Sequence, residues 1–105
     1  MKSDDYWTGL ADVISDELPE DVKGAIYRVL TFAESYIDFI QKVTEILENS
    51  GDKLIFVEEA ENLTEFLKNG WLLEDHEIYE MMPTAEKNKN DVVTGQIEFY
   101  AHDDA

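Results

Sequence analysis

The chain has 105 residues, of which 44% are hydrophobic and 11% aromatic, and its formal net charge at pH 7 is −17. This apolar content excludes the composition of a disordered chain and suits one domain, residues 1–105, with a modest core. The absence of cysteine excludes disulfides and thiolate sites, and the excess of acids makes nucleic acid and anionic membranes poor direct partners.

The first half of the chain predicts two amphipathic helices. The segment SDDYWTGLADVISDELP has apolar residues at helical spacing after a capping Ser3, and residues 19–50 carry an apolar stripe over four heptads, with Pro19 in the first turn. We expect the two to form an antiparallel hairpin, although part of the stripe would also suit a homodimer seam. The stripe comprises Val22, Ala25, Ile26, Val29, Phe32, Ala33, Tyr36, Phe39, Ile40, Val43, Ile46 and Leu47.

The second half predicts shorter elements. Residues 53–59 are rich in branched and aromatic side chains and favour a strand, and residues 60–70 favour a short helix. Residues 76–85 and 92–101 predict an antiparallel β-hairpin around the polar run 86–91, with 76–85 at an edge because of Pro83. A competing interpretation makes 76–85 a helix capped by Asp75 and ended at Pro83, with Ile78, Met81 and Met82 inward. The expected fold class is α+β: the helical hairpin with one long core helix, then a strand, a helix and the β-hairpin.

Chemistry-bearing motifs are not apparent. His76 stands among carboxylates and His102 precedes two aspartates, but neither has the spacing of a known metal site. The serines lack a nucleophile-elbow context and no glycine-rich phosphate loop is present. We therefore expect no enzyme activity, no cofactor and no bound metal.

The acidic run from Glu58 to Glu80 is the main functional signal, because it holds eight acids against the single Lys68. A rigid line of carboxylates can occupy a Lys- and Arg-lined groove shaped for phosphates, and it would speed association with a basic protein. Trp71, Tyr79, Met81 and Met82 suit either anchors for that partner or core packing. The candidate partner-binding residues are Glu58, Glu59, Glu61, Glu65, Trp71, Glu74, Asp75, Glu77, Tyr79 and Glu80.

The stretch EFLKNGWLLEDHEIYEMM, residues 65–82, resembles small phage-encoded anti-defence proteins that mimic DNA, such as anti-CRISPR and anti-restriction proteins. Its most specific part is the string Lys-Asn-Gly-Trp, residues 68–71, before an acidic segment laced with aromatic residues. The resemblance implies an inhibitor that blocks a DNA-binding surface through Glu74, Asp75, Glu77 and Glu80.

Other functions fit the same composition. An immunity protein or antitoxin for a basic nuclease toxin would share this size and acidity, and a structural protein could assemble as a homodimer through the long helix. The acidity would also suit a solvated surface that only confers solubility, or adaptation to high salt. No apolar run is long enough for a membrane span, and the acidic first residues are unlike a secretory signal. We expect a cytoplasmic protein, monomeric or homodimeric, with a basic protein partner.

Overall fold

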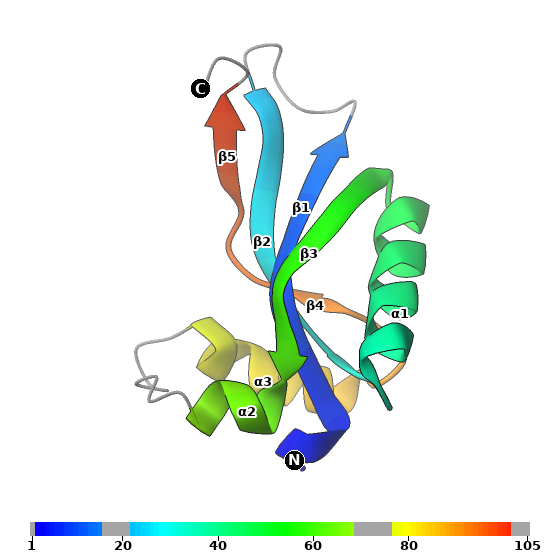
Figure 1. Cartoon of the computed structure of the whole chain (residues 1–105), viewed down its shortest axis with the longest axis vertical. Helices are drawn as coiled ribbons and strands as arrows, with labels where there is room; N and C mark the ends of the chain where they lie inside the picture. The colour runs from blue at the N-terminus through cyan, green and yellow to red at the C-terminus, as the bar shows by residue number, and fades with distance from the viewer. Residues whose placement is uncertain (1, 16–21, 69–76, 102–105) are drawn as a thin grey trace.

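The computed structural model of the chain describes residues 2–15, 22–68 and 77–101. Within these residues, no helix is long and apolar enough to cross a membrane. The described elements, in chain order, are a 3-10 helix η1 (Ser3–Asp5), β1 (Tyr6–Ser15), β2 (Val22–Phe32), α1 (Tyr36–Asn49), β3 (Asp52–Asn62), α2 (Leu63–Lys68), α3 (Glu77–Lys87), β4 (Val93–Thr94) and β5 (Glu98–Ala101) (Figure 1).

An antiparallel sheet of five strands is the centre of the fold. The strand order is β3-β1-β2-β4. β5 also pairs with β2, along the first part of that strand, whereas β4 pairs with its later part. The expected N-terminal helical hairpin is therefore wrong, because the chain forms the strand pair β1–β2 in its place. Three α-helices pack around the sheet within the described residues, so the fold is a mixed one built on a large sheet.

The predicted helix over residues 19–50 is wrong for its first part, which forms the strand β2. β2 is the central strand, and side chains on both of its faces are buried, including Val29 on one face and Leu30 on the other. A strand that is buried on both faces lacks alternating polar residues, so its sequence is a nearly continuous apolar run. Such a run also contains apolar residues at helical spacing and therefore resembles one face of an amphipathic helix. The residues of VKGAIYRVLTF decide the outcome, because glycine is a poor helix former and most of the rest favour strands.

The second part of the predicted helix is confirmed as α1. Ser35 caps its start, because its Oγ accepts a hydrogen bond from the Asp38 backbone N–H at 3.1 Å. The Asp38 carboxylate in turn accepts from the Glu34 N–H at 2.9 Å, so both side chains hold the first turn. This reciprocal cap places the break between strand and helix at residues 33–35.

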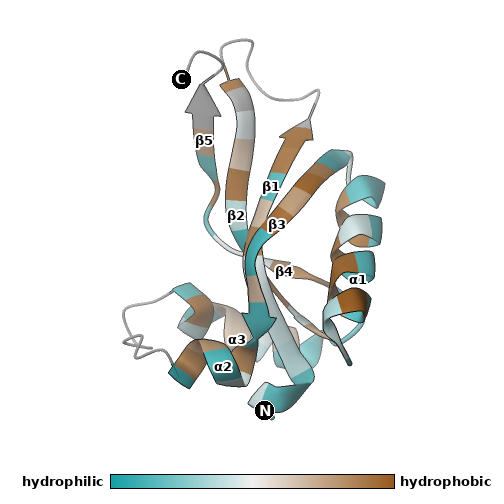
Figure 2. Ribbon diagram, in the orientation of Figure 1, coloured by the Kyte–Doolittle hydropathy of each residue, from teal (hydrophilic) through white to brown (hydrophobic). Residues whose placement is uncertain are grey.

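Two apolar cores lie on opposite faces of the sheet. On one face, Phe39 and Val43 of α1 pack against Val29 of β2. On the other, Phe66 of α2 and Ile78 of α3 belong to the cluster that includes Leu30 and Tyr6. Figure 2 shows apolar residues on α1, α2 and α3 and along the strands between them. The sheet is thus covered by α1 on one side and by α2 and α3 on part of the other.

The predicted hairpin of residues 76–85 and 92–101 is wrong, because residues 77–87 form α3. Ile78, Met81, Met82 and Ala85 recur at helical spacing; Ile78, Met81 and Ala85 are buried and Met82 packs against them. The competing helix interpretation foresaw this inward face but ended at Pro83, which lies inside α3. The capping role expected of Asp75 lies outside the described residues.

The C-terminal strand prediction is confirmed in part. Residues 93–94 and 98–101 form β4 and β5, and both pair with β2 because the expected partner segment is helical. The predictions of a strand over 53–59 and a short helix over 60–70 are confirmed by β3 and α2, with shifted ends.

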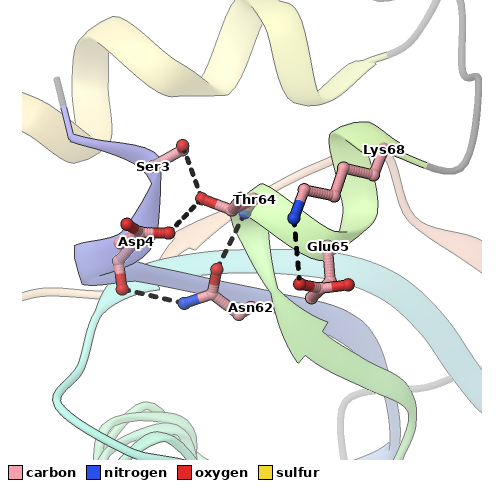
Figure 3. A network of polar contacts seen from close by, with 6 residues as sticks. All are labelled: Ser3, Asp4, Asn62, Thr64, Glu65 and Lys68. Atoms are coloured by element: carbon pink, nitrogen blue, oxygen red, sulfur yellow. Dashed lines mark hydrogen bonds and ion pairs between the residues drawn. The ribbon is translucent and has the colours of Figure 1, made fainter.

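A polar network joins the beginning of the chain to the junction between β3 and α2 (Figure 3). Asn62 accepts a hydrogen bond from the Thr64 N–H at 2.9 Å and donates its amide to the Asp4 carbonyl at 2.8 Å. The Thr64 hydroxyl donates to the Asp4 carboxylate at 2.5 Å, so the Ser3 hydroxyl, 2.7 Å away, donates to Thr64. These bonds hold α2 in a fixed position at the end of the acidic strand β3.

Candidate acidic binding surface

A β-bulge shapes the acidic part of β3. Thr8 of β1 pairs with Glu61, but Leu10 pairs with Glu58, so β3 has one residue more than β1 between these pairs. Glu59, inside the bulge, adopts a φ of 52°, a left-handed conformation that is uncommon outside glycine. The bulge interrupts the alternation of β3 at Glu58, Glu59 and Glu61, three acidic residues within four positions.

The register places two of these acids on the sheet face that α2 and α3 partly cover. Leu10 pairs with Glu58 on one side and with Arg28 of β2 on the other. Thr8 pairs with Glu61 and with Leu30, whose side chain packs in the core under α2 and α3. Since directly paired residues point to the same face, Glu58 and Glu61 share that face with Arg28.

Arg28 is the only arginine of the chain, and it is buried, with 5% of its surface exposed. Its Nη1 donates to the Thr8 Oγ1 at 3.1 Å, and its guanidinium lies 4.9 Å from the centre of the Phe66 ring. Its Nε lies 3.9 Å from Oε1 of Glu77 and lacks a hydrogen-bond partner. The guanidinium is therefore fixed by a strand, a helix and a carboxylate.

Burial lowers the pKa of Arg28, because the charged form loses water, and the carboxylates of Glu77, Glu59 and Glu61 oppose this effect. All three belong to the acidic residues singled out from the sequence. The fold thus places one carboxylate, that of Glu77 in α3, next to the buried cation, and the charges of two acids of β3 act on it as well. Arginine remains charged in proteins, so these carboxylates are attracted by a permanent positive charge.

Among the described candidate residues, Glu77 is held by contacts from both of its carboxylate oxygens. It is the first residue of α3, and its Oε2 accepts a hydrogen bond from the Gln96 N–H at 2.8 Å while Oε1 faces Arg28. Its side chain is 34% exposed. Glu77 therefore joins α3 to β2 and to the connection between β4 and β5, a structural role that the acidic run alone did not predict.

The other described candidates lie more openly. Glu65 of α2 is exposed and pairs with Lys68 at 3.6 Å (Figure 3), and Glu80 and Tyr79 of α3 are also exposed. Glu58 is half-buried.

Figure 1 shows α2 and α3 at the end of the molecule that β3 approaches with its last residues. We call Glu58, Glu59, Glu61, Glu65, Glu77 and Glu80 the acidic end. The candidates Trp71, Glu74 and Asp75 lie outside the described residues.

A cleft of about 290 Å³ opens next to the Arg28–Glu77 pair. Its lining combines aliphatic side chains with carboxylates, and a second hollow of about 580 Å³ continues along α3 past Glu77 and Glu80. The described residues contain no cluster of metal-ligating side chains, and both histidines lie outside them. The first cleft is lined by Leu10, Ile26, Tyr27, Arg28, Glu77, Gln96 and Glu98.

Comparison with protein-family models, with curated proteins and with solved structures found no match to this chain. The site must therefore be interpreted from its own residues. Sequence reasoning missed Arg28 and Glu98. A signal for Arg28 was present, because a lone arginine between Tyr27 and Val29 in a strand-forming run has apolar neighbours on both sides.

Proposed function

We propose that this protein is a small acidic inhibitor that acts as a DNA mimic, binding and blocking a basic nucleic-acid-binding protein such as a bacterial defence nuclease. The observation that carries the proposal is the fixed pair of Arg28 and Glu77 on the sheet face that also bears Glu58 and Glu61, next to the other carboxylates of the acidic end. A protein that recognises phosphates by cationic side chains would find carboxylates held there by a sheet and two helices.

Preorganisation supports this function. Arg28 attracts the carboxylates of Glu77, Glu59 and Glu61 and so offsets part of the repulsion among them. Glu77 is also held by the Gln96 N–H, so that little conformational entropy is lost when a partner binds this carboxylate. The exposed carboxylates of Glu65 and Glu80 extend the negative charge along α2 and α3, and such charge speeds the encounter with a basic protein. The fixed carboxylate of Glu77 gives a defined geometry, and the exposed acids give long-range attraction.

The test uses affinity capture from a lysate of the source organism, with the intact protein as bait. A basic nucleic-acid-binding protein should be captured at about 50 mM salt and released by about 500 mM, because screening shortens the range of exposed charges. Added duplex DNA should compete with the bait for the captured protein. Capture that withstands high salt and is indifferent to DNA would contradict the proposal, and capture of a nuclease toxin would assign the role of an immunity protein.

Matched charge variants locate the contact. The variant Glu59→Gln, Glu65→Gln, Glu80→Gln removes exposed carboxylates of the acidic end. The control variant Glu34→Gln, Glu45→Gln, Glu48→Gln removes as many exposed carboxylates in and just before α1, which covers the other face of the sheet. The first variant should associate with the partner more slowly, while the control should bind nearly as the wild type does. Equal weakening by both would indicate a response to net charge alone.

A further inference from the structure

Among residues 2–15, 22–68 and 77–101, the side chains next to the Arg28–Glu77 pair cover one face of the sheet only in part. In one row across the strands, Glu58 pairs with Leu10 and Leu10 with Arg28. In the next row, the order is Phe56, Asp12, Ile26 and Glu98. We call the following residues the open sheet face: Leu10, Asp12, Ile26, Phe56, Glu58 and Glu98.

Acidic and apolar side chains interleave on the open sheet face. Phe56 is 48% exposed and Glu98 is exposed, whereas Leu10 and Ile26 are half-buried. A second bulge lies beside Phe56, because Asp12 pairs with Phe56 and the following residue, Val13, pairs with Leu54. The bulged edge of β3 is a poor template for adding another strand, so a partner would dock on the face.

The cleft described above opens on this sheet face, since Leu10, Ile26 and Glu98 line it. Leu10 and Ile26 supply its aliphatic wall, and the carboxylates of Glu77 and Glu98 stand at its polar side. At about 290 Å³ it lies at the lower limit of pockets that hold small molecules, which suits an inserted side chain better than a cofactor. The side chains of lysine and arginine match this lining, because each has an aliphatic stem that ends in a positively charged group.

We propose that the open sheet face docks the basic partner, which inserts a lysine or arginine side chain into the cleft and packs an apolar side chain on Phe56. The proposal rests on the function proposed above and names the chemistry of its contact. Charge selects this occupant over a second copy of the chain, because two molecules of formal net charge −17 repel each other and would pair acids with acids. The positive charge of Arg28 is offset by the carboxylate of Glu77, 3.9 Å away, and the carboxylate of Glu98 in the cleft lining can receive the inserted charge.

Two synthetic peptides test the proposal by calorimetry at about 50 mM salt, where the screening length is about 14 Å and surface charges still act beyond direct contact. In one, lysine alternates with leucine; in the other, of equal length and charge, lysine alternates with serine. The leucine peptide should bind at least about tenfold more tightly. The free energy gained by burying one large apolar side chain exceeds the free energy that corresponds to a tenfold change in affinity. Phe56→Gln should remove this preference, and Glu98→Gln should weaken both peptides.

Two exposed residues of α1 provide matched controls. Ile37→Gln and Glu48→Gln likewise replace an exposed apolar residue and an exposed glutamate by glutamine, on the helix that covers the other face of the sheet, and should leave both affinities unchanged. Equal affinity of the two peptides for the wild type, or an unchanged preference in Phe56→Gln, would overturn this inference. In that case, salt-dependent capture of a basic protein would leave the proposed function standing.

The oligomeric state gives a further independent outcome. Sedimentation should show a monomer across the concentration range used for calorimetry. A dimer that dissociates in the Phe56→Gln variant and persists in Ile37→Gln would assign the open sheet face to a second copy and overturn the inference. If the leucine peptide shows the expected preference while no basic protein is captured from lysate, the docking chemistry holds and the proposed function fails.

Discussion

Glu77 and Arg28 connect α3 to the central strand β2, with Oε1 of the carboxylate 3.9 Å from Nε of the guanidinium. The other carboxylate oxygen accepts the Gln96 N–H at 2.8 Å, so one side chain joins a helix, a strand and a loop. Arg28 would otherwise be a buried cation facing only the acids of β3, and a buried charge is tolerated only when it is paired. The pair therefore determines where α3 begins relative to the sheet.

The first prediction concerns this connection. Glu77→Ala should lower the free energy of unfolding by about 1 to 3 kcal/mol, because it removes a charged partner of Arg28 and the acceptor of the Gln96 N–H. This loss of stability should be smaller than for a fully buried ion pair, because the Glu77 side chain is 34% exposed. Urea unfolding measures the loss. Glu80→Ala, one turn further along α3 and exposed, should change stability by less than about 0.5 kcal/mol. Equal effects would contradict the assigned role.

The second prediction follows from the position of Gly95. A methyl group on Gly95 would stand 2.5 Å from Oε2 of Glu77, so Gly95→Ala must displace the carboxylate from the Gln96 N–H. We expect a loss of about 1 to 2 kcal/mol in the wild type. In the Glu77→Ala background the same change should be neutral or stabilising by up to about 1 kcal/mol, because the obstructing atoms are gone and alanine restricts the unfolded chain. A double-mutant cycle in urea measures this coupling, and additive effects would argue against it.

Phe32 and Phe39 show where sequence periodicity misleads. They stand seven residues apart on one predicted helical stripe, yet Phe32 lies in β2 and packs near α2 and α3, whereas Phe39 lies in α1 on the other face of the sheet. Apolar spacing alone does not separate a helix from a strand buried on both sides. The cap at Ser35 was readable in the sequence, as serine followed three residues later by Asp38, and it would have divided the stripe at the right place.

The candidate site was predictable in charge but not in arrangement. The density of acids from Glu58 onward indicated an acidic surface, and the fold places the described members of that run on β3, α2 and α3. The placement of Glu58 and Glu61 on the face that carries Arg28 depends on pairings between residues distant in the chain, such as Thr8 with Glu61, which local patterns do not encode. Glu77 shows the consequence, because a residue expected to serve only as surface charge also holds the fold together.

The third prediction tests the bulge that positions the acids of β3. Gly9 stands opposite the bulge, and a methyl group there would lie 2.5 Å from Cγ1 of Val57 and 3.2 Å from both Cα of Ala60 and the carbonyl oxygen of Glu58. Gly9→Ala should therefore cost about 1 to 3 kcal/mol by overpacking, measured by urea unfolding. The variant Val57→Ala removes the nearest atom, so adding Gly9→Ala to it should cost less, yet remain unfavourable because the two backbone contacts persist. Full tolerance of Gly9→Ala would show that β1 and β3 do not approach so closely.

The last prediction concerns alkaline pH and the contact between Tyr27 and Asp52. The buried Tyr27 hydroxyl donates to Oδ2 of Asp52 at 3.1 Å, and burial, followed by the charge and the hydrogen bond of Asp52, raises the pKa of Tyr27 above its ordinary value near 10. The stability due to this raised pKa is fully present below about pH 10. Above that pH the unfolded tyrosine loses its proton while the folded one keeps it, so the free energy of unfolding should fall by up to about 1.4 kcal/mol per pH unit.

Tyr27→Phe separates these effects. Near pH 7 the variant should lose about 0.5 to 1.5 kcal/mol, the net value of one hydrogen bond. Between about pH 10 and 11.5 its stability should decline less steeply than that of the wild type, so that the difference narrows and can reverse. A smaller slope should remain because burial also raises the pKa of Tyr6. Urea unfolding across this pH range measures both curves, with Tyr79→Phe, a change at an exposed ring, as the control expected to follow the wild type. If Tyr27→Phe kept the full alkaline slope, the loss of stability would have to come from another group, and the Tyr27–Asp52 bond would contribute only at neutral pH.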